Sequence, residues 1–534
     1  MEIVLRFLAF FLNAFGILVN KILDLVLPRK RPKFQGIRNP LLNKSVTELV
    51  THLRRGEISS VDLTSAYIAR IKEVNPTLNA VVEERFEAAM QDARLADDFI
   101  AKARSDFDRI ALYTKYPILG VPFTVKESCS LKGLSYSVGS LIRKDMKAPQ
   151  DGDVVELVRA AGGIPLLVSA NPEFCMSFET SNNIQGRCLN PYDLRRTTAG
   201  SSGGEAALNA VGATPFGVAS DISGSIRLPA MFCGVFGHKP TGGLTSTKGH
   251  FPYSLTDPQF PRMLQLGPIT RFARDLPILL QIMAGTNSHK LKIEEQVPLK
   301  DMKVYYAYGF SGLNCLTHPV VDFDIKLAIT KAVKCLERGG VQAKKLDLKF
   351  FGNSLEMALV SLVDLKGLPS IVTQRHDRDP SMRLLIVELF NSAIGHSIFT
   401  KEAMFLEVMK RFNGLIASGN MERYREEVKK LKTHLNQLLG TRGVLILPTF
   451  HTSALCFHTS LVNVTGIDQM LLFNILGLPA THVPMGLNQR GMPIGIQVVA
   501  AQYQDKLCLK VAGELEAVFQ GWVPPVPHAT ESSK

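Results

Sequence analysis

Two serines and one lysine carry the clearest chemical signal in this chain of 534 residues. Ser201 lies in the glycine-rich run TTAGSSGGE (residues 197–205), and Ser225 lies further along in DISGSIR (residues 221–227). Lys126 directly follows the largely apolar run PFTV. An ammonium group is costly to bury in such surroundings, which favours the neutral amine that can accept a proton. Glycine-flanked serines and such a lysine indicate a nucleophile activated without histidine, and therefore acyl transfer.

The segment around Ser225 also suggests how a developing negative charge could be stabilised. Residues 216–220 are predicted to form a strand that ends at Asp221 and continues into the tight turn ISGS. Backbone N–H groups crowded around a serine are what an oxyanion hole requires. Asp221 and Arg227 bracket the serine, and we expect them to pair and brace the loop. The alternative is a loop of small residues that only packs against the sheet.

A different nucleophile, Ser202, is suggested by GSSGG (residues 200–204), which matches the pattern G-x-S-x-G. In α/β-hydrolases this motif directly follows a strand and works with a histidine and an acid further along the chain. The preceding residues RRTTA make a poor strand. The candidate histidines are His238, His451 and His482, and nothing in the sequence positions them. The hydrolase interpretation is therefore not favoured, and taken alone this segment is a structural glycine turn.

Short apolar strands alternate with helices through most of the chain. The predicted strands are residues 117–125, 164–168, 216–220, 444–448 and 494–499. Buried strands separated by helices indicate an α/β sheet covered on both faces. Ahead of these strands, capping boxes at Ser45 and Ser59 and a predicted helix over residues 83–102 indicate a layer of helices over residues 40–105.

The same patterns divide the chain into three parts. Residues 1–33 are predicted to be a hydrophobic anchor with a basic flank, residues 34–110 an N-terminal helical layer, and residues 111–534 the catalytic core. Within the core, residues 290–440 are more helical and variable in character, which predicts an insertion or cap.

The composition is that of an ordinary globular protein, with 46% hydrophobic residues, 20% charged residues and a net charge of +13. Basic residues are scattered and no base-reading motif occurs, so nucleic acid is not an expected partner. The one dense cluster, RKRPK at residues 29–33, follows an apolar segment, which favours an anionic membrane surface. Eight cysteines occur without a C-x-x-C pair, which predicts buried free thiols and neither a zinc site nor a disulfide framework.

The apolar N-terminal segment is interpreted as a retained membrane anchor. Residues 3–20 are apolar apart from Arg6, Asn13, Gly16 and Asn20. A spanning helix needs about 20 predominantly apolar residues, and the charge-free part is shorter, although Arg6 can extend it by reaching toward the interface. The anchor therefore either spans the membrane or lies in its surface. Positive charge on its C-terminal side predicts a single anchor with a cytoplasmic catalytic domain.

Taken together, the serine and lysine segments resemble the amidase signature family. The resemblance extends over nearly all of the chain after the anchor and is most specific over residues 199–240. Further matches are NPEF at 171–174, GHKPTG at 237–242, GPITR at 267–271 and GMPIGIQ at 491–497. The resemblance implies a single large α/β domain with a twisted mixed β-sheet covered by helices on both faces. It also implies an amide hydrolase that needs no metal or organic cofactor.

The resemblance assigns a role to each residue of the predicted site. It makes Ser225 the nucleophile, Ser201 a bridging serine on a cis peptide, and Lys126 the base, close to which Ser202 is expected to hydrogen-bond. It also makes Ser202 a supporting residue, in addition to Asp221 and Arg227, which are expected to brace the loop. The oxyanion donors that it implies are the backbone amides of Ile222, Ser223, Gly224 and Ser225.

Two positions depart from the family pattern, which usually has glycine where Ala199 and Ser223 stand. The change at Ala199 is mild unless its φ is positive. The change at Ser223 is more serious, because its amide is expected to line the oxyanion hole and a non-glycine residue rarely adopts a positive φ. Ser223 therefore motivates an alternative function, a catalytically weak scaffold bound to a membrane.

The anchor suggests a substrate dissolved in the bilayer. Residues 384–412 are a second apolar segment, with Ile394 and Ile398, and also Phe405, Met409 and Phe412, at helical spacing. This segment is either a core-facing helix or a membrane-docking cap.

We therefore hypothesise that the substrates are fatty acid amides, either primary amides or N-acylethanolamines. The alternative is a broad-specificity amidase for short-chain or aryl amides, and a glutamine-using amidotransferase subunit is less favoured because it needs no anchor. The expected partners are a lipid amide substrate and a membrane, and a homodimer is compatible with the sequence.

Overall fold

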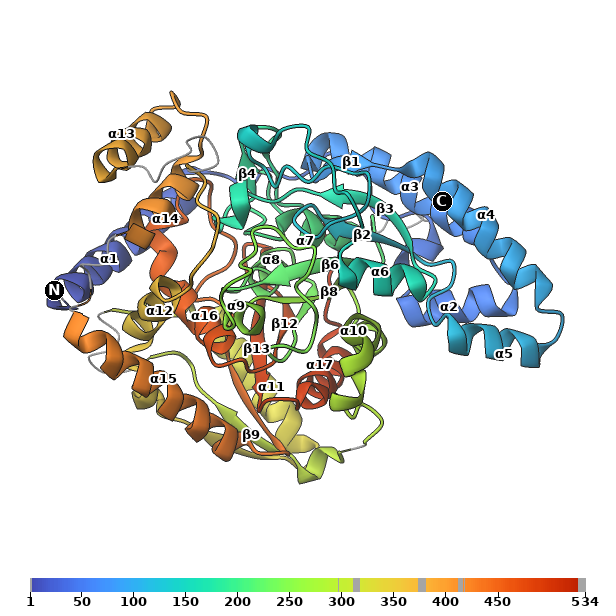
Figure 1. Cartoon of the computed structure of the whole chain (residues 1–534). Coiled ribbons are helices and arrows are strands. Elements are labelled where there is room, and N and C mark those ends of the chain that lie inside the picture. Colours follow the sequence, from blue (N-terminus) through green and yellow to red (C-terminus); the bar gives the residue numbers. More distant parts are fainter. Residues whose placement is uncertain are drawn as a thin grey trace.

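An 11-stranded β-sheet runs through the protein and carries helices on both faces (Figure 1). The computed structural model describes residues 2–295, 297–310, 317–372, 381–411, 416 and 418–526. The strands of the sheet stand in the order β1-β3-β2-β6-β8-β7-β12-β13-β11-β9-β10, and β4 and β5 form a separate two-stranded sheet. This architecture confirms the predicted α/β fold with one large domain.

The strands are short, and most of them are buried on both faces. Their bounds are β1 Val81–Glu84, β2 Pro122–Lys126, β3 Ile164–Ser169, β4 Ser181–Asn182, β5 Gly186–Arg187, β6 Phe216–Asp221, β7 Phe236–Lys239, β8 Gln265–Thr270, β9 Lys303–Tyr306, β10 Gln342–Lys345, β11 Gly443–Pro448, β12 Ala480–Leu487 and β13 Pro493–Ala500. The sheet is mixed, because β2 is parallel to both of its neighbours, β3 and β6, whereas β6 is antiparallel to β8.

The helices form the outer layers. Their bounds are α1 Glu2–Val26, α2 Val46–Arg55, α3 Ser60–Leu78, α4 Phe86–Lys102, α5 Asp106–Lys115, α6 Asp153–Ala160, α7 Gly203–Ala210, α8 Arg227–Phe232, α9 Phe260–Met263, α10 Leu276–Ala284, α11 Phe323–Arg338, α12 Ser354–Val363, α13 Met382–Ala393, α14 Lys401–Arg411, α15 Ser418–Leu439, α16 Asp468–Ile475 and α17 Asp505–Phe519. One apolar cluster packs α8, α11 and α17 against the sheet, and another packs α2–α4, α6 and α10.

The N-terminal layer is helical apart from one strand. Ser45 forms a complete capping box at the start of α2, and the Ser59 side chain caps α3, as the sequence predicted. The helix predicted over residues 83–102 begins later, at Phe86, because Val81–Glu84 form β1 and pair antiparallel with β3 at one edge of the sheet. The prediction of a purely helical layer is wrong at this strand, since pairing with β3 overrides the helix propensity of its glutamates.

The strand leading to Lys126 is shorter than predicted. β2 begins at Pro122, and the residues before it form a turn in which Gly120 has a φ of +80°. Glycine adopts that left-handed conformation without a steric penalty, so the apolar run 117–121 enters the core as a turn.

The region 290–440 contributes α11 to α15 and also two strands. β9 and β10 pair in parallel with each other at the second edge of the sheet, and β9 continues the sheet from β11. Ile394 and Ile398, predicted to share a helix face, instead lie at the end of α13 and in its connection to α14, because α13 ends at Ala393. The predicted stripe residue Phe412 lies outside the described residues.

The predicted anchor is the helix α1, at the opposite end of the molecule from α2 and α5 (Figure 1). Within the described residues, it is the helix that is long and apolar enough to cross a membrane. It does not project away from the body, because Leu5, Ala9 and Asn13 are buried against the rest of the protein.

Candidate active site

Lys126 and the turn that carries Ser225 lie at the same edge of the sheet. Lys126 is the last residue of β2, and Asp221 is the last residue of its parallel neighbour β6. The carboxyl ends of neighbouring parallel strands meet at one edge, where α/β proteins commonly bind ligands. Ser201 joins them from the segment just before α7, and the Gly200–Ser201 peptide bond is cis.

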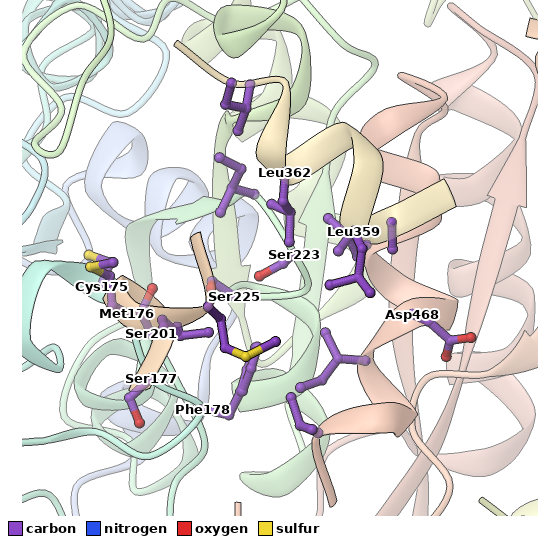
Figure 2. Close-up of a pocket in the computed structure, with 18 of the residues that line it drawn as sticks. Cys175, Met176, Ser177, Phe178, Ser201, Ser223, Ser225, Leu359, Leu362 and Asp468 are labelled. Atoms are coloured by element: carbon purple, nitrogen blue, oxygen red, sulfur yellow. The ribbon is translucent and has the colours of Figure 1, made fainter. Parts of the chain in front are cut away.

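Direct contacts connect the lysine to the serine-rich segments. The Lys126 Nζ atom lies 2.7 Å from Ser201 Oγ and 2.9 Å from Ser220 Oγ. The Ser202 amide donates to the Ser225 carbonyl at 3.2 Å, and the Ser202 hydroxyl donates to the Ser220 carbonyl at 3.2 Å. Ser202 therefore ties the two serine segments together, and Ser201 and Ser225 line the same pocket (Figure 2).

The turn before Ser225 leaves three amides available. The Gly224 amide donates to Asp221 Oδ1 at 2.7 Å, so it supports the turn and is not the free oxyanion donor that the sequence predicted. Among the described residues, none accepts a hydrogen bond from the amides of Ile222, Ser223 or Ser225. These three N–H groups remain the candidates for binding an oxyanion.

A buried ion pair holds this turn. Arg227 Nε donates to Asp221 Oδ2 at 3.0 Å, and both side chains are fully buried. The guanidinium also donates to Asn474 Oδ1 at 2.6 Å and to Gln497 Oε1 at 3.1 Å. Burial by itself raises the pKa of Asp221, but the charge and hydrogen bonds of Arg227 outweigh burial and hold this pKa well below its usual range. An ionised Asp221 can therefore keep accepting from the amides of the turn.

The two departures from the family pattern differ in their backbone conformation. Ser223 does not have a positive φ, so the strain expected there is absent and that expectation was wrong. Ala199 does have a positive φ, of 62°, which costs an L-residue roughly 1–2 kcal/mol relative to glycine. The glycine that the turn before Ser225 requires is Gly224, whose φ is 109°.

Substitutions at Gly224 and Ser223 should have very different effects. A Cβ on Gly224 would lie 2.6 Å from Met470 Sδ, and the φ of 109° adds strain. We expect Gly224→Ala to lower amide hydrolysis about 100-fold or more, the loss typical of a disrupted oxyanion hole. Ser223→Gly should change the rate by less than about threefold, because the backbone there is already relaxed. Rate measurements on both variants, with melting temperatures as a folding control, test this; a tenfold gain in Ser223→Gly would contradict it.

Two residues that the sequence did not single out, Ser220 and His250, complete the surroundings of Lys126. His250 Nε2 lies 2.9 Å from Ser220 Oγ, and His250 Nδ1 lies 2.9 Å from the Pro252 carbonyl oxygen. Burial, and secondarily Lys126, lower the pKa of His250 to about 3, so the ring is neutral near pH 7. The carbonyl can only accept, so Nδ1 carries the proton and Nε2 accepts from the Ser220 hydroxyl.

This arrangement fixes the direction of the hydrogen bonds around Lys126. Because the Ser220 proton points to His250, the Ser220 oxygen accepts from Lys126 Nζ. One N–H group of Lys126 therefore donates to Ser220. The lone pair of a neutral Lys126 amine would then be available to accept a proton from Ser201. Ser220 could have been suspected from the sequence, because it ends the predicted strand 216–220 and stands next to Asp221. No sequence pattern pointed to His250, which follows a glycine in a loop and reaches the site through tertiary pairing with Cys129.

Variants of His250 test whether it acts through Ser220. We expect His250→Leu to lower kcat about tenfold with little change in KM, since it removes one hydrogen-bond acceptor. His250→Gln keeps an acceptor and should retain most of the activity. In a Ser220→Ala background, the loss caused by His250→Leu should nearly vanish. An equal loss in both backgrounds would show that His250 serves packing alone.

The buried residues near the site do not support Ser202 as the nucleophile. His238 hydrogen-bonds with Thr481 and Asp505, and His482 with Thr449. His451 hydrogen-bonds with Asn463. Each candidate histidine of the hydrolase interpretation is therefore engaged elsewhere, and no strand precedes Ser202 directly.

Glu205 is a further buried acid close to Lys126. Its Oε2 accepts from Thr124 Oγ1 at 2.6 Å, and Thr124 and Lys126 point to the same side of β2. Burial raises the pKa of Glu205 to about 7, against the effect of the Thr124 hydrogen bond. Gly217 makes room for this carboxyl group, since a Cβ there would lie 1.7 Å from Glu205 Oε2.

A cavity of about 360 Å³ opens onto the serines and is lined mainly by apolar side chains (Figure 2). Ser201, Ser223 and Ser225 contribute to one part of the wall, and α1, α12 and α14 contribute Leu, Ala, Val, Met and Phe side chains. Its size and lining suit an extended hydrocarbon chain.

One group of side chains could in principle hold a metal ion. Ligand atoms of Glu179, Glu402 and His458 lie within 4.8 Å of one another. Both ring nitrogens of His458 already contact cations, however, with Lys401 Nζ at 3.0 Å from Nδ1 and Arg187 against Nε2. The donor set therefore does not suit a metal ion, since both nitrogens would have to lose these contacts.

The fold and this site define the class of protein. A family model described as Amidase matches residues 62–509, and the chain belongs to the amidase signature family. Fatty-acid amide hydrolase 2 of Homo sapiens is 36% identical over 532 residues, which cover 97% of this chain and 98% of that protein. Fatty-acid amide hydrolase 2-B of Danio rerio is 37% identical over 506 residues, which cover 93% of each chain.

Solved structures agree on the fold. A bacterial aryl acylamidase of the amidase signature family superposes with a TM-score of 0.72 at 19% identity, over 92% of this chain and 100% of that one. The family and its fatty-acid amide hydrolase relatives make this protein an amide hydrolase, as the sequence predicted.

Proposed function

We propose that the protein is a membrane-associated serine amidase that hydrolyses fatty acid amides, either primary amides or N-acylethanolamines. The observation that carries this proposal is an apolar cavity lined in part by Ser225 and Ser201, with Lys126 in contact with Ser201. Relatives that are named fatty-acid amide hydrolase 2 and align over nearly the whole chain support the substrate class. A glutamine-using subunit is less favoured, since glutamine would not fill an apolar cavity.

In the proposed mechanism, Lys126 begins as a neutral amine. It takes a proton from the Ser201 hydroxyl, and Ser201 takes the proton of Ser225 as the Ser225 oxygen forms a bond to the amide carbonyl carbon. The carbonyl oxygen becomes an oxyanion that the amides of Ile222, Ser223 and Ser225 stabilise.

The same relay then runs in reverse. Ser201 delivers a proton to the amide nitrogen and is itself reprotonated by Lys126, because nitrogen leaves poorly without a proton. The C–N bond breaks, the amine departs, and the acyl group stays on Ser225 as an ester. Water, deprotonated through the relay, attacks this ester and releases the fatty acid and the regenerated Ser225 hydroxyl.

Exposed apolar side chains on two helices support membrane association. On α1 the outward-facing residues Phe7, Phe11 and Phe15 are each more than half exposed, and on α13 Phe390 is 64% exposed. Such a surface suits the interface of a bilayer, and the basic cluster at residues 29–33 follows α1 directly. In this proposal α1 is the single anchor, and the catalytic domain is cytoplasmic, because the basic cluster is attracted to the anionic cytoplasmic leaflet.

The substrate class can be tested with two amides. We expect the full-length protein to hydrolyse oleamide with a kcat/KM at least about tenfold above that for a short aryl amide such as acetanilide, because the apolar cavity buries the acyl chain. Ser225→Ala should abolish both activities. Efficient turnover of the aryl amide with none of oleamide would favour the broad-specificity alternative.

The relay predicts that Lys126 matters more for amides than for esters. We expect Lys126→Ala to lower oleamide hydrolysis by about 100-fold or more, the range for lost general acid–base catalysis, and methyl oleate hydrolysis clearly less. An ester's alcohol leaves without prior protonation more readily than an amine. The exposed Lys132→Ala is the matched control and should leave both rates unchanged. Equal losses for amide and ester would contradict the relay.

A further inference from the structure

The helix α1 contributes part of the pocket wall. Leu5, Leu8, Ala9 and Leu12 line the same cavity as Ser201 and Ser225. An anchor whose only task is to hold the protein at a membrane has no need to border the reaction site. The position of these four side chains therefore calls for a second role of the helix.

Specific polar contacts fix α1 to the catalytic body along most of its length. The contacts join Arg6 to Glu356 and Asn353, Asn13 to Thr465, Asn20 to Asn463, and Asp24 to Arg196 and Arg490. Four polar residues on one side of an apolar helix thus each find a partner on the body. In an apolar environment each would be costly to leave unpaired.

Close backbone packing adds to this attachment. A Cβ on Gly16 would lie 2.7 Å from the Val462 carbonyl oxygen, so the glycine lets α1 approach the segment Leu461–Ile467. These contacts hold α1 along the body, so its inner side lies on the protein and its apolar outer side is exposed. Such a position suits a helix that lies in the membrane surface.

One pocket residue also faces outward. The Leu8 side chain lines the cavity and is nevertheless 49% exposed. Leu8 therefore stands where the cavity reaches the surface, on the helix that carries the exposed apolar side chains.

We propose that α1 is a wall of the acyl-binding pocket and helps to set the preferred acyl-chain length, with the chain entering beside Leu8 from the membrane surface. This inference rests on the proposed function, because it assigns the apolar cavity to the acyl chain of the substrate. It makes α1 a specificity-determining element in addition to an anchor.

The same substitution on the two sides of α1 provides the test. Leu12 lines the pocket, whereas Leu18 faces outward and is 55% exposed. We expect Leu12→Phe to lower the ratio of kcat/KM for oleoyl amide over hexanoyl amide about tenfold, since pocket volume restricts long chains. Leu12→Ala should raise this ratio, and Leu18→Phe should leave it within about twofold of the wild-type value. Detergent micelles of fixed composition remove differences in membrane binding.

A covalent readout keeps the test independent of amide turnover. Rates of labelling by short-chain and long-chain alkyl fluorophosphonates report on the same wall and also show that each variant is folded. If Leu12→Phe and Leu18→Phe share one chain-length profile in both assays, α1 is not a wall of the pocket. If the wild-type protein turns over hexanoyl amide but not oleoyl amide, the proposed substrate class fails, and the labelling profile still decides the role of α1.

Discussion

The buried ion pair between Asp221 and Arg227 is the interaction on which the rest of the site depends. It lies at the end of β6, where a charged pair is sealed from solvent, and its carboxylate holds the amides of Gly224 and Ile226. Breaking a buried pair of this kind typically costs about 3–5 kcal/mol, because the remaining charge is left without a partner. The arginine extends this network through Asn474 and Gln497 to α16 and β13, so the turn that carries Ser225 is fixed from both sides.

A second chain of polar groups surrounds Lys126, the proposed base. Lys126, Ser220 and His250 form a sequence of hydrogen bonds that ends at a backbone carbonyl, and the fixed carbonyl determines the direction of every bond before it. The two networks act on different parts of the site. Asp221 and Arg227 fix the backbone at Ser225, the proposed nucleophile, and His250 and Ser220 determine which atoms of Lys126 remain for Ser201. In the proposed function the apolar cavity brings the substrate to this polar edge, and α1 lines one side of the cavity.

Much of the fold was predictable, because its signals are local. Apolar runs such as Ile164–Ser169 and Phe216–Asp221 indicate central strands, and capping residues such as Ser45 indicate where helices begin. Lys126, Ser201 and Ser225 stood out because each lies in a motif with unusual glycine or apolar neighbours. The strand β1 was missed, since its four residues become a strand only by pairing with β3.

The remaining errors concern contacts between distant segments. His250 lies in a loop without a motif, and only tertiary structure places it next to Ser220. The need for glycine was assigned to Ser223, whereas Gly224 is the position that has a positive φ and lies close to Met470. The sequence alone does not show which residue of a tight turn takes that conformation. Likewise, the apolar pattern of α1 indicated a membrane segment but could not show that Asn13 and Asn20 have partners on the body.

Identifying the serine that becomes acylated is the most direct test of this account. The full-length protein would be labelled to completion with a fluorophosphonate, digested, and the modified peptide located by mass spectrometry. The account predicts one adduct, on Ser225, that is absent in Ser225→Ala while that variant remains folded. An adduct on Ser201 or Ser202, or a folded wild-type protein that takes up no label, would contradict it.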